Sequence, residues 1–133
     1  MKKLKLLLNL LLLLIPSTIF GSHEVYLLHC YFCPAMVMDR IEKSCIKENF
    51  QTVNYHYKSI SENLDTLGHE LYFEIKNSGV DSVSFVTHSM GALVVRSMLQ
   101  YSQSDEKFPD IFRVVMIAPP NHGSEMADFG ATV

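Results

Sequence analysis

The sequence lacks an excess of positive charge. Residues 22–133 carry 8 Lys and Arg against 14 Asp and Glu, a net charge of −6. A nucleic-acid-binding surface needs clustered basic side chains that neutralise phosphates, so we expect no nucleic-acid partner. Internal repeats and low-complexity linkers are also missing, and 48% of the residues are hydrophobic. The 133 residues therefore predict one folded domain, because domains commonly span roughly 100–200 residues.

The chain also lacks an apolar run as long as a membrane-spanning helix needs, which is ~20 residues. Its longest run, residues 6–15, is apolar except for Asn9; it follows three lysines in the first five positions and precedes a small residue at Gly21. This order is typical of a signal peptide. We therefore predict a signal peptide at residues 1–21 and export to the periplasm, the cell envelope or the medium. An uncleaved N-terminal segment that anchors the protein is the alternative.

Cysteine is scarce, with Cys30, Cys33 and Cys45 in one 16-residue stretch. In an exported protein an odd number leaves one thiol unpaired or paired with another chain. Cys30 and Cys33 form a C-x-x-C motif, which is compatible with a redox site. Without a second pair it supplies only half of a zinc site. The simplest explanation of the motif is two buried, small apolar side chains or an adventitious disulfide, and we expect no metal and no cofactor.

Hydrophobic periodicity predicts strands that alternate with helices along the mature chain. Ser59 and Glu62 have the spacing of a capping box at the start of the second helix. The strands are expected at residues 24–31, 50–57, 83–87 and 112–118, and the helices at residues 36–48, 60–78 and 90–103. This order is typical of a parallel sheet whose strands are joined by right-handed crossovers. We predict an α/β fold with helices on both faces of the sheet.

The residues with the clearest chemical meaning lie where the third strand becomes a helix. Thr87-His88-Ser89-Met90-Gly91 is a variant of the G-x-S-x-G nucleophile elbow, with threonine in place of the first glycine. An elbow forces its serine into a strained backbone conformation and needs small residues two positions before and after it. Gly91 meets this requirement. The alternative is an ordinary turn in which Ser89 is the N-cap of the helix.

Three segments together resemble the α/β-hydrolases, and within them the bacterial lipases and esterases. They are residues 86–96 (VTHSMGALVVR), 28–31 (LHCY) and 118–124 (APPNHGS). The resemblance implies that residues 22–133 form the N-terminal and central portion of an α/β-hydrolase domain, a partial α/β-hydrolase fold. It also implies a serine hydrolase that acts on carboxylic esters, with an ester or lipid as substrate and transient contact with a lipid surface.

The resemblance assigns roles to individual residues. Ser89 would be the nucleophile, and the backbone N–H groups of Met90 and Tyr31 would bind the oxyanion. No residue matches the catalytic acid or the catalytic histidine, which therefore stay unknown. His122 is the least implausible base and Asp128 a still weaker candidate for the acid, because a base must come within hydrogen-bond reach of the serine.

Two further functions stay open on the sequence alone. One is a catalytically dead, hydrolase-like module that binds a partner or a lipid. The other is a thiol–disulfide protein that uses Cys30 and Cys33. The family's strand order would also place residues 112–118 at the border of the sheet, where an apolar strand with unpaired backbone groups is a predicted aggregation site.

Overall fold

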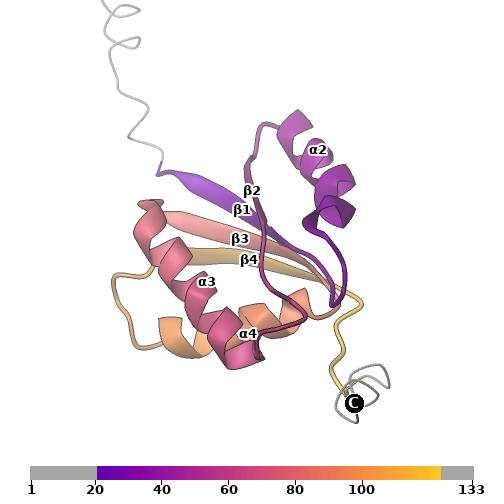
Figure 1. Cartoon of the computed structure of the whole chain (residues 1–133). Helices are drawn as coiled ribbons and strands as arrows, with labels where there is room; N and C mark the ends of the chain where they lie inside the picture. The colour runs from indigo at the N-terminus through magenta and orange to yellow at the C-terminus, as the bar shows by residue number, and fades with distance from the viewer. Residues whose placement is uncertain (1–20, 124–133) are drawn as a thin grey trace, which may run out of the picture.

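The computed structural model describes residues 21–123, which form one parallel sheet with helices packed on it (Figure 1). The elements are β1 (His23–Leu28), the 3-10 helix η2 (Ala35–Met38), α2 (Asp39–Lys47), β2 (Gln51–Tyr55), α3 (Leu64–Ser78), β3 (Ser82–His88), α4 (Gly91–Ser102) and β4 (Asp110–Ile117). The predicted signal peptide lies almost wholly outside the described residues. Among the described helices, none is long and apolar enough to cross a membrane.

The four strands lie in the order β2-β1-β3-β4, and each neighbouring pair is parallel. The predicted α/β fold is therefore confirmed. The chain turns to one side of β1 to form β2 and then crosses to the other side to form β3 and β4. Between β1 and β3 the sheet thus has a switch point, where the loops that leave the two carboxyl ends diverge. Such a crevice is where open parallel sheets commonly bind ligands.

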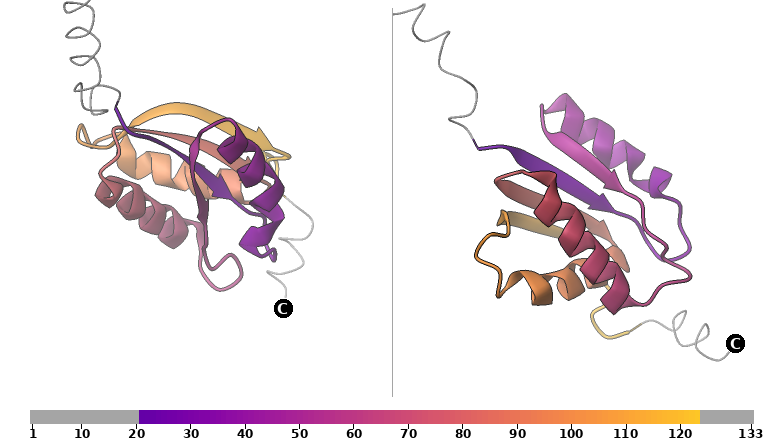
Figure 2. Two further views of the ribbon diagram at one scale, coloured as in Figure 1. Left: turned by 90° about the horizontal axis from the view of Figure 1, so that it is seen from above. Right: turned by 60° about the vertical axis from the view of Figure 1, so that its left-hand side comes forward.

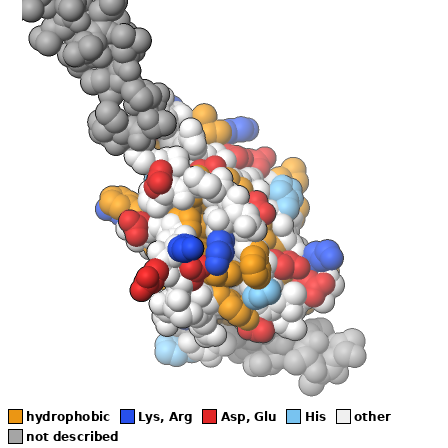
Figure 3. Space-filling view, turned by 90° about the vertical axis from the view of Figure 1, so that its left-hand side faces the viewer, with side chains coloured by type: hydrophobic (Ala, Val, Ile, Leu, Met, Phe, Trp, Pro, Cys, Tyr) orange, Lys and Arg blue, Asp and Glu red, His pale blue; other side chains and the backbone are white. Residues whose placement is uncertain are grey.

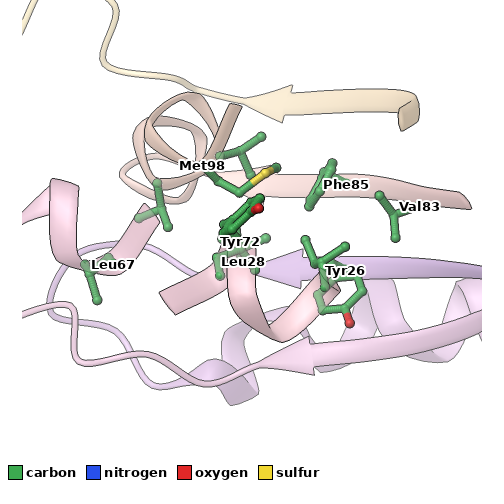
Figure 4. Packing of buried hydrophobic residues seen from close by; sticks show 11 residues of the cluster. Tyr26, Leu28, Leu67, Tyr72, Val83, Phe85 and Met98 are labelled. Atoms are coloured by element: carbon green, nitrogen blue, oxygen red, sulfur yellow. The ribbon is translucent and has the colours of Figure 1, made fainter. Parts of the chain in front are cut away.

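Helices cover both faces of the sheet, as predicted. Figure 2 shows α3 and α4 on one face and α2 on the other. The larger core lies under α3 and α4, where side chains from the helices meet alternate side chains of β1 and β3 (Figure 4). Its buried members are Tyr26, Leu28, Leu67, Leu71, Tyr72, Ile75, Val83, Phe85, Val94, Val95 and Met98. A smaller cluster of Val25, Leu27 and Met38 lies under η2 and α2. The two clusters fix β1, which is buried on both faces.

Close packing of α3 on α4 depends on Gly68. A Cβ atom at this position would overlap the Ser97 side chain and lie 2.8 Å from the Met98 nitrogen. The absence of a side chain at Gly68 therefore lets the two helices approach closely.

Two local predictions are wrong. Ser59 and Glu62 do not cap α3; the helix begins after Asn63, whose side chain accepts a hydrogen bond from the Thr66 N–H at 2.9 Å. The Asn63 side chain thus binds one of the backbone N–H groups that the first turn of the helix would otherwise leave unpaired. The helix therefore starts later than the Ser59–Glu62 spacing indicates. The first predicted helix also begins as the short 3-10 segment η2 and becomes α-helical only at Asp39.

The sheet ends at β4, which has a neighbour on one side only among the described residues. Its apolar side chains are unusually exposed: Phe112 is 73% accessible, Val115 44% and Ile117 40%. Within the described residues, β4 is therefore an uncovered, apolar border strand, as predicted for residues 112–118.

The amino ends of the strands lie at the opposite end of the molecule from the switch point. Figure 3 shows this end, where acidic and basic side chains are interspersed. The loop between α4 and β4 is attached to α3 by Asp105, which accepts a hydrogen bond from the Tyr72 hydroxyl and pairs with Lys76, both at 2.6 Å. The hydrogen bonds from Lys76 and Tyr72 lower the pKa of the Asp105 carboxyl to about 2.

Candidate functional site

Ser89 adopts the strained backbone that an elbow requires. It directly follows β3 and has a φ of 51°, in the left-handed region that disfavours side chains. Its N–H donates a hydrogen bond to the Ile117 carbonyl at 2.9 Å, which ties the turn to the end of β4. The N-cap of α4 is Met90, and no side chain caps the helix. Ser89 is therefore a turn residue whose hydroxyl is not used as a helix cap.

Gly91 lets the elbow approach the end of β1. A Cβ atom at this position would lie 2.7 Å from the Leu28 carbonyl oxygen and 3.0 Å from the His29 carbonyl oxygen. These distances are too short for any side chain. Thr87, at the position of the motif's first glycine, is fully buried, and its hydroxyl lies 3.4 Å from the Val115 carbonyl oxygen. The small residues thus allow the loops after β1 and β3 to meet.

His29 fixes the loop that follows β1. Its Nδ1 lies 2.9 Å from the Cys30 carbonyl oxygen, so this nitrogen carries the proton and donates it. The imidazole stacks on the Tyr57 ring with centroids 4.1 Å apart, and the Tyr57 hydroxyl donates to the His29 carbonyl oxygen. Burial lowers the pKa of His29 and raises that of Tyr57, which keeps both groups neutral. These contacts make His29 a fixed part of the loop.

Cys30 and Cys33 form a disulfide in this loop, with their Cα atoms 5.3 Å apart. The Cys33 N–H also donates to the Cys30 carbonyl oxygen at 3.3 Å, which closes a tight turn around Tyr31 and Phe32. Phe32 has a φ of 60° and is 69% exposed. Within residues 21–123, the half-buried Cys45 is the free cysteine. Of the explanations that the sequence allows for the C-x-x-C motif, the structure therefore shows the disulfide.

The two loops enclose a pocket of about 620 Å³ at the switch point of the sheet. Ser89, Met90 and Tyr31, to which the family resemblance assigns joint roles, all line it, as do His88 and both cysteines. The remaining lining residues are Ser59, Ile60, Glu62, Asn63, Leu64, Leu93, Ala118, Pro120 and Gly123. The pocket is mainly apolar, and a few polar side chains also line it. Such a composition is typical of a site for a small organic ligand.

A whole wall of the pocket was not predicted from the sequence. It comes from residues 59–64, between β2 and α3, where Ser59 is buried and Ile60 is 60% exposed. Glu62 in this wall forms an ion pair with Lys58 at 3.9 Å. One signal was present: in a parallel sheet, the loops that follow successive strands emerge at the same edge. This rule places the segment after β2 near the segments that follow β1 and β3.

In the part of the chain that the structure describes, no histidine nitrogen forms a hydrogen bond with Ser89. Within residues 21–123, the histidine nitrogens that form hydrogen bonds are Nδ1 of His23, to Ser82, and Nδ1 of His29, to Cys30. His122 is exposed and is not among the pocket-lining residues. Asp128 lies outside the described residues. No three His, Cys, Asp or Glu side chains of the described part gather as ligands for a metal ion.

Comparison with known proteins corrects the family resemblance. The matching family model is described as "Domain of unknown function (DUF7379)" and covers residues 34–132; no α/β-hydrolase family is found. Identification of residues 86–96, 28–31 and 118–124 as α/β-hydrolase segments is therefore wrong. Any sharp strand-to-helix turn needs small residues around it, so the pattern reflects local geometry and does not establish a family. A search of curated proteins gives no match. The match spans well over half of the chain, which therefore belongs to the DUF7379 family, a domain of unknown function.

Proposed function

We propose that this protein is an exported serine hydrolase that acts on carboxylic esters, with Ser89 as the nucleophile. One observation carries the proposal: Ser89 has a φ of 51° at the strand-to-helix junction and lines the pocket at the carboxyl edge of the sheet. A left-handed non-glycine residue costs roughly 1–3 kcal/mol and is concentrated at functional sites. A serine held in this conformation beside a pocket supports the use of its hydroxyl as a functional group.

The arrangement favours acyl transfer. In this reaction the Ser89 oxygen would bond to the carbonyl carbon of an ester, while its proton passes to a base and the carbonyl oxygen becomes an oxyanion. The N–H groups of Met90 and Tyr31 are the proposed oxyanion donors. Among residues 21–123 neither N–H has a backbone hydrogen-bond partner, so both are available. A donor of this kind is worth about 3 kcal/mol in the transition state.

Export is supported by the order of residues 1–21 and by the Cys30–Cys33 disulfide, because structural disulfides persist mainly outside the reducing cytosol. N-terminal sequencing of the protein recovered from the producing cells tests this proposal. A mature form that begins near Ser22 is expected. Recovery of the full-length chain only from the cytoplasm would contradict it.

The hydrolase proposal is tested with the full chain and a series of p-nitrophenyl esters. Ser89→Ala should abolish hydrolysis above the buffer rate. Ser59→Ala is the matched control, because Ser59 is a buried serine of the same pocket but does not lie on the elbow. It should keep most of the activity. Hydrolysis that survives Ser89→Ala and is lost in Ser59→Ala would overturn the assignment.

A catalytically inactive binding module is the second candidate. It is favoured by one observation: within residues 21–123 no histidine forms a hydrogen bond with Ser89. Without a base and an acid, turnover falls by several powers of ten, although the pocket still binds. A binding module would take up a neutral ester analogue with the same affinity in wild type and Ser89→Ala, and neither protein would release product. A thiol–disulfide activity that uses Cys30 and Cys33 is less favoured, since Cys30 is only 8% exposed.

A further inference from the structure

The disulfide lies in the wall of the catalytic pocket, not at a distance from it. Cys30 and Cys33 both line the pocket with Ser89, and the residue that follows Cys30 is Tyr31, the proposed second oxyanion donor. The disulfide therefore closes a ring of four residues that contains this donor. Its position suggests a role beyond general stability.

The two sides of this loop are held in different ways. On the amino side, the backbone of Leu28 and His29 packs against Gly91, and His29 is fixed by Tyr57. On the carboxyl side, the turn is closed by the disulfide and by one hydrogen bond of 3.3 Å from the Cys33 N–H. Tyr31 lies between the two attachments. Loss of the disulfide would free the carboxyl side while the amino side stays packed.

Phe32 shows that the turn needs this closure. It combines a φ of 60° with a side chain that is 69% exposed, so little burial offsets the cost of a left-handed phenylalanine. A turn of this kind relaxes when its ends are released. The Tyr31 N–H belongs to the same planar peptide unit as the Cys30 carbonyl, which accepts hydrogen bonds from His29 Nδ1 at 2.9 Å and from the Cys33 N–H at 3.3 Å. Release of Cys33 would therefore remove one of the two contacts that orient the Tyr31 N–H, and would free the Cys30 side chain beside it.

We propose that the Cys30–Cys33 disulfide is a positioning element of the active site, which holds the Tyr31 N–H where the oxyanion forms. This inference rests on the proposed hydrolase function. It predicts that the oxidised chain is the active form. Reduction by a water-soluble phosphine breaks the S–S bond: the phosphine supplies two electrons and becomes the phosphine oxide with oxygen from water, and two protons complete the thiols. The donor then loses its fixed position.

The test measures ester hydrolysis by the full chain before and after reduction. Active sites are counted in a separate aliquot by complete labelling with a fluorophosphonate, so kcat is expressed per chain whose serine is able to react. Reduction should lower kcat per site by about 10²–10³-fold, the usual effect of one lost oxyanion donor, with KM within about twofold. Oxidised glutathione should restore it. The double variant Cys30→Ser/Cys33→Ser should have the low kcat permanently, and Cys45→Ser should respond as the wild type does.

The outcomes separate this inference from the function on which it rests. An unchanged kcat per site after reduction, with thermal stability lowered or not, would show that the disulfide is structural only. A rise in KM at constant kcat would show that it shapes substrate binding instead, and would also overturn the inference. Failure of the oxidised chain to react at Ser89 would refute the hydrolase function itself, and the positioning role with it.

Discussion

Because the backbone of Ser89 is left-handed, we predict that glycine is more stabilising than alanine at this position, the reverse of the usual order. At an ordinary position glycine destabilises a protein relative to alanine, but Ser89 has a φ of 51°. The left-handed conformation costs an L-residue roughly 1–2 kcal/mol, and the extra backbone entropy that glycine loses is roughly 0.5–1 kcal/mol. Ser89→Gly should therefore be more stable than Ser89→Ala by about 1 kcal/mol. Thermal melts should differ by roughly 4–8 °C in a domain of this size.

Ser44 provides the matched control, because it is an exposed serine inside α2. There the order should reverse, with glycine about 1 kcal/mol less stable than alanine. Both pairs can be measured by circular dichroism on otherwise identical chains. If Ser89→Ala melts at or above the temperature of Ser89→Gly, the turn at Ser89 carries no left-handed strain and the reasoning fails.

The other predictions concern packing, acid stability and association. Gly91→Ala should lower the free energy of unfolding by roughly 1–3 kcal/mol in a urea titration, because its Cβ would lie 2.7 Å from the Leu28 carbonyl oxygen; wild-type stability would contradict this. Asp105 has a pKa lowered to about 2, so its stabilisation is complete above its ordinary value of 3.8 and is lost as the pH falls toward 2. Asp105→Asn should thus lower the urea midpoint near neutral pH, and its difference from wild type should close below about pH 4; a difference independent of pH would refute it. The isolated 22–133 segment should associate through its exposed β4, and Val115→Lys should reduce its size in light scattering. A wild-type segment that is monodisperse, monomeric and cooperatively folded would contradict this.

The fold was largely predictable because each element obeys a local rule. Alternating apolar residues in Ser82–His88 and helical spacing in Gly91–Ser102 identify a strand and a helix without tertiary information. The serine at their junction was predictable for the same reason. Its left-handed backbone is expected because the chain changes from a strand to a helix within three residues.

The parts that were not predictable depend on contacts between distant residues. The C-x-x-C spacing is compatible with several chemistries, and only the fold decides that Cys30 and Cys33 pair beside Ser89. Ser59 resembles a helix cap in sequence, but its N–H bonds to the Tyr57 carbonyl at 2.9 Å and its side chain is buried in the pocket wall. The family resemblance was wrong for a related reason. A short motif reflects the local geometry of a turn and does not by itself show common ancestry.

The most direct measurement is covalent labelling of the oxidised full chain with a fluorophosphonate, followed by peptide mass spectrometry. An activated serine reacts with this probe, whereas an ordinary surface serine does not. We expect one modified residue, Ser89, with labelling lost in Ser89→Ala and retained in Ser59→Ala. A chain that hydrolyses esters while Ser89 stays unmodified, or a folded chain in which no serine reacts, would show that this elbow does not carry a catalytic nucleophile.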